Sequence, residues 1–434
     1  MKLSSSGKLH IRKHTFPQWV TLFIFTMPFL LAFLQNIMMF PTLIKYTLDV
    51  AWVLVTISML FRRNVTVKKR LLPFVILVAA FFLFTLFVYL FRFQSIFYYL
   101  WGFRNNFRFY FAFFAYCTYL DDEDVTTCFK FIDIVFWIDV VVCLYQFFAL
   151  GYKQDFLGGI FGVERGCNAY TITFLSIVLI KSMLLFMDKK ESFVSCALKC
   201  AVILLISALA ELKFMFLIFV VILLLSAVFT SYSWRKVLLF LVVFLFFTVA
   251  STIITQMYGE NSQITFERIF ELITADSYAT ESDLGRMTAI PVIAATILTN
   301  FWSRLFGLGL GNCDASNFAI CNTPFYQSHS ELHYTWFSSA FLFLEVGYIG
   351  ILFFVLFFIL CFVLSAVMKK KGTSDTFYCQ MAMIMCVVCI ILMFYNPSLR
   401  SEISYLIYFI LALPFIGCKK ESASALSSDF GIDP

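Results

Sequence analysis

Two histidines and two arginines lie in residues 285–350, the longest part of the chain without an obvious membrane span. His329 and His333 are four residues apart, so on a helix they would share one face. A neutral imidazole can take a proton from a sugar hydroxyl, and such a pair can also bind zinc, although no third ligand accompanies it. Arg286 and Arg304 carry guanidinium groups, which fit phosphate and carboxylate oxygens. A solvated or hydrogen-bonded structural role is the alternative for each histidine.

The composition is that of a membrane protein. The chain has 434 residues, of which 62% are hydrophobic and 13% charged, whereas soluble domains are about 45–50% apolar and about 25% charged. The net charge of +6 comes from Lys and Arg residues in short links, which indicates membrane orientation and argues against nucleic-acid binding. The first apolar run is long enough to span and follows basic residues, so we expect no cleavable signal peptide.

Twelve apolar runs predict twelve transmembrane helices, because about 20 helical residues cross the hydrocarbon core. The predicted spans are Gln18–Leu34, Leu43–Phe61, Leu71–Leu90, Arg104–Leu120, Phe131–Leu150, Tyr170–Met187, Phe193–Ala210, Phe214–Thr230, Val237–Ile254, Val346–Val367, Phe377–Met393 and Ile403–Ile416. The predicted fold class is therefore all-α, a polytopic protein with a single integral membrane domain, residues 1–434. One long loop, residues 258–345, is expected to contain short amphipathic helices.

Basic residues orient this topology. They cluster in six places, namely Lys2 to Lys13, Arg62 to Arg70, Lys189–Lys190, Arg235–Lys236, Lys369–Lys371 and Lys419–Lys420. All six clusters fall on the same side of the predicted spans, so the positive-inside rule places both termini in the cytoplasm and the long loop outside it. The polar tail, residues 421–434, is expected to be disordered in the cytoplasm.

The long loop contains two predicted helices. Residues 265–273 carry apolar side chains at helical spacing, and a second helix is expected from Gly285 to Trp302, capped by Ser282 or Asp283. We expect the second helix to lie on the membrane face, because its apolar run is short and interrupted.

Glycines and cysteines also mark the loop. The turn Gly307–Gly311 lacks the Lys and Ser or Thr of a phosphate-binding P-loop. We therefore expect these glycines to allow a tight bend of the chain at the membrane surface. Cys313 and Cys321 could form a disulfide if the loop lies outside the cytoplasm, and two free thiols are the alternative.

Eight cationic side chains are predicted on the outer side, where the positive-inside rule disfavours them. They are Arg92, Arg104, Arg108, Arg165, Lys213, Arg286, Arg304 and Arg400. Such a group suits an anionic ligand, whereas snorkelling to headgroups would explain each arginine singly. For Lys213 the alternative is an ion pair with Glu211 that marks a tight turn.

Five short motifs follow one another in an order that is also found in a known protein family. They are Val163-Glu-Arg165-Gly166, Gly285-Arg286, Trp302 to Gly311, His329-Ser-Glu-Leu-His333 and Leu344 to Gly350. In this order, and with the predicted topology, the chain resembles the bacterial O-antigen polymerase and ligase superfamily, the Wzy-like and WaaL-like proteins of lipid-linked polysaccharide assembly. The likeness covers roughly Val163 to Leu360.

The resemblance implies an inverting, metal-independent glycosyl transfer, without a cofactor, at the outer face of the bacterial inner membrane. A glycan would leave an undecaprenyl diphosphate carrier and join an acceptor hydroxyl, and a chain-length regulator protein is a candidate partner. His329 is the first candidate for the family's loop histidine and His333 the second, with Arg286 also assigned to catalysis. Arg165, Lys213, Arg286, Arg304 and Arg108 would bind the diphosphate, and the spans would form a groove for the polyprenyl tail.

Three functions remain open. Polymerisation of repeat units of O-antigen, capsule or exopolysaccharide is the first. An O-antigen ligase that transfers the glycan to the lipid A core would use the same donor chemistry. A polysaccharide or lipid transporter would also need many spans, but the sequence shows no inverted repeat and few ionisable groups deep in the predicted spans.

Overall fold

The structure, a computed structural model, describes residues 14–61, 69–164, 166–230, 234–259, 271, 274–275, 283–316 and 318–416. Every regular element in these ranges is helical, and no strand occurs among them. A helix pairs its backbone N–H and C=O groups within one segment, as the hydrocarbon core of a membrane requires. The predicted all-α class is confirmed for these residues.

In the described part of the chain, twelve helices of 13 to 34 residues form the bundle. They are α1 (Phe16–Asn36), α2 (Tyr46–Leu60), α3 (Leu72–Arg92), α4 (Ile96–Tyr119), α5 (Asp122–Phe148), α6 (Cys167–Met187), α7 (Phe193–Leu209), α8 (Lys213–Phe229), α9 (Trp234–Tyr258), α14 (Ser338–Lys371), α15 (Thr376–Tyr395) and α16 (Ser404–Ile416). Each predicted span overlaps one of them. Within the described residues, eight are long and apolar enough to cross a membrane, while α7, α8 and α16 are apolar but shorter. The chain is thus a multi-pass membrane protein, and the count of twelve crossings stays a prediction.

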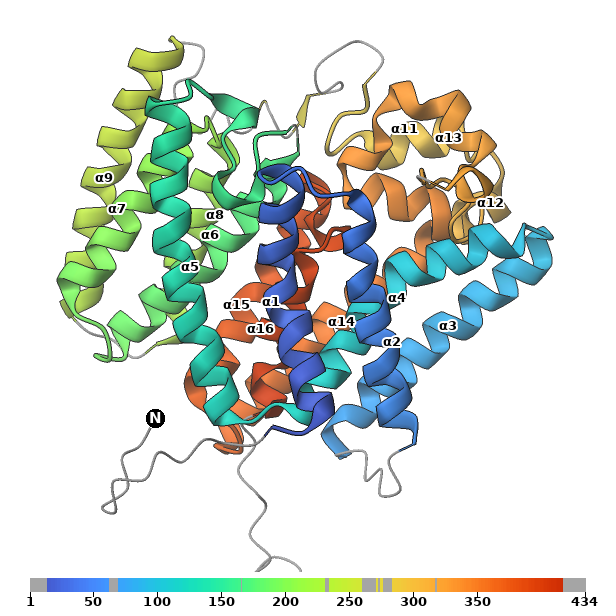
Figure 1. Cartoon of the computed structure of the whole chain (residues 1–434), viewed down its shortest axis with the longest axis horizontal. Coiled ribbons are helices and arrows are strands. Elements are labelled where there is room, and N and C mark those ends of the chain that lie inside the picture. Colours follow the sequence, from blue (N-terminus) through green and yellow to red (C-terminus); the bar gives the residue numbers. More distant parts are fainter. Residues whose placement is uncertain are drawn as a thin grey trace, which may run out of the picture.

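The helices divide the bundle into regions that differ in their surroundings (Figure 1). Helices α5 to α9 lie on the left, α2 to α4 on the right, and α14 to α16 between them with α1 in front. The apolar window of α6 is 89% buried, whereas that of α2 is 17% buried. Helix α6 therefore belongs to the core of the bundle, and α2 presents most of its apolar surface to lipid.

The ends of the helices gather on two opposite faces, as the predicted topology requires. The face that we call the basic end holds the starts of α1, α3, α5, α7, α9 and α15. There His14 contacts Asp124 (2.9 Å between Nε2 and Oδ1), and Arg70 donates to the carbonyl of Thr373 (3.5 Å). The opposite face, the loop end, holds the starts of α2, α4, α6, α8, α14 and α16 together with the long loop. Which end faces the cytoplasm stays a prediction.

The described part of the long loop folds over the loop end as three short helices, α11 (Ala289–Thr296), α12 (Phe301–Phe306) and α13 (Pro324–His329) (Figure 1). The predicted continuous helix from Gly285 to Trp302 is wrong, because the side chain of Asn300 accepts a hydrogen bond from the backbone N–H of Ser303 (2.7 Å) and starts a new helix. The predicted helix at 265–273 lies outside the described residues except for residue 271, and the tail 421–434 lies wholly outside them.

The glycine turn joins the loop to the bundle. Helix α14 is broken at Gly347 (φ 62°, ψ −164°), and the freed carbonyls of Leu344 and Glu345 accept hydrogen bonds from the N–H groups of Leu308 (2.7 Å) and Gly309 (2.9 Å). A side chain at Gly347 would meet the backbone of Arg304 and Leu305, at the end of α12. The turn thus caps a kink in α14, which fixes the loop against the helix.

We expect Gly347→Ala to lower the free energy of unfolding by at least about 1–3 kcal/mol, because this backbone region admits essentially only glycine. The added Cβ would also collide with the carbonyls of Arg304 and Leu305. The thermal midpoint of the purified protein in detergent measures the effect. Gly372→Ala is the matched control, since Gly372 ends the same helix with φ 63° in open space, and it should cost less. Equal midpoints for both variants would contradict this account of the kink.

A short segment before α6 folds back into the bundle. Residues Leu157 to Phe161 are buried, and Gln146 on α5 exchanges two hydrogen bonds with Gly159 (2.8 Å each). The carboxylate of Asp139, also on α5, accepts a hydrogen bond from the N–H of Ile160 (2.9 Å). These polar side chains satisfy backbone groups at the start of a single 3-10 turn, Gly159–Phe161, so the segment can lie inside an apolar bundle.

Candidate functional site

The described loop has a small apolar core of its own. Its buried residues include Leu284, Ile293, Leu298 and Tyr334, which pack against Phe341 at the start of α14. The hydroxyl of Tyr334 donates to the carbonyl of Cys313 (2.6 Å), which ties two distant parts of the loop together. The loop therefore holds polar side chains on a fixed support. Cys313 and Cys321 are both free thiols, so no disulfide joins them.

His333 pairs with a carboxylate that is far away in the sequence. Its Nδ1 lies 2.5 Å from Oδ1 of Asp283, and its ring stacks on Trp336 with 4.0 Å between the centroids. The Asp283 side chain is 1% exposed, whereas that of His333 is 40% exposed. An Nδ1–H that donates to a buried carboxylate leaves the lone pair on Nε2. This geometry suits a general base that faces solvent.

His329 lies in different surroundings. It ends α13, its ring stacks on Phe325 (4.4 Å between centroids), and its Nδ1 lies 2.7 Å from the Ser328 hydroxyl and 3.2 Å from the Phe325 carbonyl. The expectation that the two histidines share one helix face is wrong, because α13 stops at His329 and His333 has left-handed backbone (φ 50°). The contacts of His329 with Ser328 and Phe325 are thus local ones, whereas His333 has an acidic partner.

Arg286 lies on an aromatic stack between the loop and the bundle. Its side chain is buried, and its guanidinium carbon lies 4.6 Å from the centroid of the Tyr395 ring. That ring stacks on Phe214 at 3.6 Å with an interplanar angle of 5°. Because Phe214 directly follows Lys213, the structure brings Arg286 to the start of α8. The ion pair of Lys213 with Glu211 is also confirmed (3.1 Å).

Arg108 belongs to a separate ion pair, in which its own side chain is 3% exposed and that of Glu402 is 22% exposed. It donates to Oε1 of Glu402 (3.3 Å) and to the carbonyl of Arg400 (3.2 Å), while the hydroxyl of Tyr170 donates to Oε2 of Glu402 (2.7 Å). Burial alone would raise the pKa of the Glu402 carboxyl. The Arg108 guanidinium and the Tyr170 hydroxyl stabilise the carboxylate more strongly and lower its pKa from the ordinary 4.5 to about 2.

The low pKa of Glu402 predicts a loss of stability in acid. A carboxyl whose pKa is lowered by folding stabilises the protein above its unfolded pKa, and this contribution disappears as the pH falls from about 4.5 to about 2. We expect the thermal midpoint of the wild-type protein to fall more steeply over this range than that of Glu402→Gln. The variant should already be less stable at pH 7. Parallel pH profiles of the thermal midpoint for the two proteins would argue against the low pKa of Glu402.

Most of the other predicted outer cations also have protein partners. The Nε of Arg304 donates to the carbonyls of Ala294 (3.1 Å) and Leu298 (3.0 Å), so Arg304 caps the end of α11. Arg92 donates to the carbonyl of Gly307 (2.8 Å), and the guanidinium of Arg104 forms a two-point pair with Asp49 (2.9 and 2.8 Å). Arg165 lies outside the described residues. The loop end is thus less strongly cationic than its Lys and Arg content indicates.

A further acidic pair was not anticipated from the sequence. Asp314 accepts a hydrogen bond from Asn105 on α4 (2.5 Å) and lies 3.9 Å from the guanidinium of Arg400. Glu345 is fully buried and accepts a hydrogen bond from the N–H of Gly311 (2.9 Å). These contacts anchor the loop to α4 and to the link between α15 and α16. We assign them to positioning of the loop, since Asp314 and Oε1 of Glu345 accept hydrogen bonds from protein donors.

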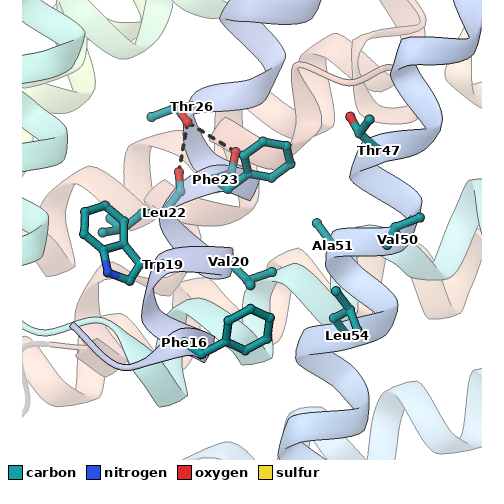
Figure 2. Close-up of a pocket in the computed structure, with 10 residues that line it drawn as sticks. All are labelled: Phe16, Trp19, Val20, Leu22, Phe23, Thr26, Thr47, Val50, Ala51 and Leu54. Carbon is teal, nitrogen blue, oxygen red and sulfur yellow. Dashed lines mark hydrogen bonds between the residues drawn. The ribbon is translucent and has the colours of Figure 1, made fainter.

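An apolar groove of about 700 Å³ runs between α1 and α2 (Figure 2). Phe16, Trp19 and Phe23 line it from α1, and Val50 and Leu54 line it from α2. Both helices present these side chains outward, and Val50 is 60% exposed. The groove is therefore open to the hydrocarbon of the surrounding membrane.

Comparison of the chain with protein-family models, with curated protein sequences and with solved structures found no match.

Proposed function

We propose that this membrane protein transfers glycans from a polyprenyl diphosphate donor to an acceptor hydroxyl, and that it thereby polymerises oligosaccharide repeat units. The observation that carries the proposal is the Asp283–His333 pair at the loop end. Asp283 lies three residues before Arg286, whose guanidinium packs on the ring of Tyr395. The exposed imidazole edge of His333 and the Arg286 guanidinium belong to one folded loop, which supports a base and a cation acting on the same substrate. The order of motifs in the sequence supports the same chemistry.

The proposed reaction is a single displacement. Nε2 of His333 takes the proton of the acceptor hydroxyl as that oxygen attacks the anomeric carbon of the donor sugar. The bond between this carbon and the diphosphate oxygen breaks, so the configuration inverts and polyprenyl diphosphate leaves. Arg286 and Lys213 would stabilise the negative charge that develops on the leaving oxygen. Asp283 would keep His333 in the tautomer that accepts the proton.

The membrane context fits a lipid-linked donor. With the basic end in the cytoplasm, the loop end would face the outside of a bacterial inner membrane, where such donors are consumed. The groove between α1 and α2 offers an apolar surface for a polyprenyl chain (Figure 2). Both termini would then be cytoplasmic, as the positive-inside rule predicts.

Deletion of the gene in its own host, with the surface polysaccharide separated on a gel, tests the proposal. We expect the deletion strain to carry single repeat units on an otherwise intact acceptor, and wild-type protein to restore long chains. Long lipid-linked chains that never reach the acceptor would instead indicate a ligase. Lipid-linked repeat units that accumulate inside the cell would indicate a transporter. An unchanged glycan profile would refute all three.

A further inference from the structure

A second pocket lies at the basic end, remote from the proposed site. It has a volume of about 550 Å³ and is formed by the link between α6 and α7 and by the start of α9. Lys189, Lys190 and Arg235 contribute three cationic side chains to its lining. Phe186, Phe193 and Leu238 contribute apolar walls. One cavity thus combines a cationic part with an apolar part.

The one acidic residue in the described lining does not cancel this charge. Glu191 lines the pocket, but Oε1 of its carboxylate accepts hydrogen bonds from Lys199 (2.9 Å) and Ser195 (2.6 Å), and Oε2 accepts one from Ser182 (2.9 Å). Its charge is therefore compensated by Lys199, which comes from inside the bundle. The described lining therefore holds three cations beside one carboxylate, which already has Lys199 as its partner.

The pocket lies where a membrane surface would meet the protein. Trp234, the first residue of α9, is 78% exposed, and tryptophan prefers the boundary between hydrocarbon and headgroups. Leu238, one turn further along α9, is 44% exposed. Val194 at the start of α7 is 73% exposed. The basic ends of α7 and α9 stand at the left edge of the bundle (Figure 1), where lipid can reach them from the side.

From this arrangement we infer that the pocket is a binding site for the headgroup of an anionic phospholipid from the leaflet at the basic end. The phosphate would contact Lys189, Lys190 and Arg235, since guanidinium and ammonium groups bind phosphate oxygens strongly. The acyl chains would leave along Phe193 and Leu238 into the membrane. The guanidinium of Arg235 already lies against a wall of the pocket, 5.7 Å from the Phe186 ring. Basic pockets between helices on the cytoplasmic side of membrane proteins bind anionic headgroups in this way.

Lipid retention by the purified full-length protein tests the inference. The protein is exchanged into detergent with phosphatidylglycerol or phosphatidylcholine at equal concentrations, and bound lipid is counted by native mass spectrometry. The test variant is Lys190→Gln/Arg235→Gln. The matched control is Lys370→Gln/Lys371→Gln, which removes two exposed cations from the same end, outside the pocket. A third variant, Lys190→Arg/Arg235→Lys, keeps the charge and checks that the pocket variant is folded.

We expect wild-type protein to retain phosphatidylglycerol over phosphatidylcholine, and the pocket variant to lose about 10- to 30-fold in apparent affinity, as removal of two basic residues at a membrane surface implies. The control and the charge-preserving variant should stay within about threefold of wild type. Equal losses in the pocket variant and the control would overturn the inference, because any surface cation would then serve. Displacement of the lipid by millimolar inorganic phosphate would also overturn it, since the site would then bind free anions.

Discussion

Glycan polymerisation should fall about 100- to 10,000-fold when His333 is replaced by Gln, while the protein still folds and reaches the membrane. The magnitude is the ordinary contribution of a general base to a proton-transfer step. The Asp283→Asn variant should lose polymerisation activity by a factor in the same range, because an amide can stabilise the tautomer of His333 that carries its proton on Nε2. The measurement is the initial rate of chain growth by purified protein in vesicles that contain a lipid-linked repeat unit.

Two comparisons make this prediction specific. His329→Gln should lower the rate by less than about threefold, since the Phe325 and Ser328 contacts of His329 are local and its sequence neighbour His333 holds the carboxylate partner. The double variant Asp283→Asn/His333→Gln should be no slower than the slower single variant, because residues that act as one unit are not additive. A slow His329→Gln enzyme together with a His333→Gln enzyme of normal rate would contradict this prediction. It would support the sequence-based expectation that His329 is the functional histidine.

The sequence predicted the membrane helices well because length and apolarity are strong local signals. It predicted their ends less well, since caps and not hydropathy decide where a helix begins. The fifth span was predicted from Phe131, but α5 begins at Asp122, where the side chain of Asp121 accepts hydrogen bonds from the N–H groups of Glu123 and Asp124. Hydropathy reports the part of a helix that lies in lipid, and not its first turns.

The functional pairing could not be read from the sequence in the same way. Asp283 was expected only as a helix cap, yet it pairs with a histidine 50 residues away. The backbone contact of Leu284 with Leu332 (3.3 Å), which brings the two segments together, depends on the tertiary fold of the loop. The outer cations show the same limit. Their positions near the loop end were predictable, but their carbonyl and carboxylate partners were not, apart from the pair of Lys213 with Glu211.

The partners of charged residues inside the helix bundle were likewise not predictable from the sequence. Few ionisable groups were expected deep in the predicted spans; of those that the helices contain, Lys181 on α6 pairs with Asp133 on α5 (2.5 Å). Lys199 on α7 lies between Asp133 (3.6 Å) and Glu191 (2.9 Å). Charges in a membrane interior are tolerated when they pair with one another. This network explains how three helices carry charged residues, and it does not by itself favour transport.

Arg108→Leu should destabilise the folded protein by about 3 kcal/mol, because removal of one partner from a buried ion pair leaves the other without compensation. Glu402 would keep the hydrogen bond from Tyr170 but lose its guanidinium partner. The thermal midpoint in detergent, and the amount of protein that accumulates in the membrane, measure the loss. Arg286→Leu should act differently, with a large fall in the rate of polymerisation and a smaller change in the midpoint.

The double variant Arg108→Leu/Glu402→Leu decides between a structural and a substrate-binding role for Arg108. If the arginine serves mainly to neutralise Glu402, removal of both charges should restore much of the lost stability, since apolar replacements of a buried pair are often close to neutral. Polymerisation should return with it. The resemblance instead implies that Arg108 binds the donor diphosphate, and with that role the double variant would be stable and inactive. A stable, inactive double variant would therefore place Arg108 in the reaction site, whereas recovery of both properties would leave Arg286 and Lys213 as the cations that face the donor.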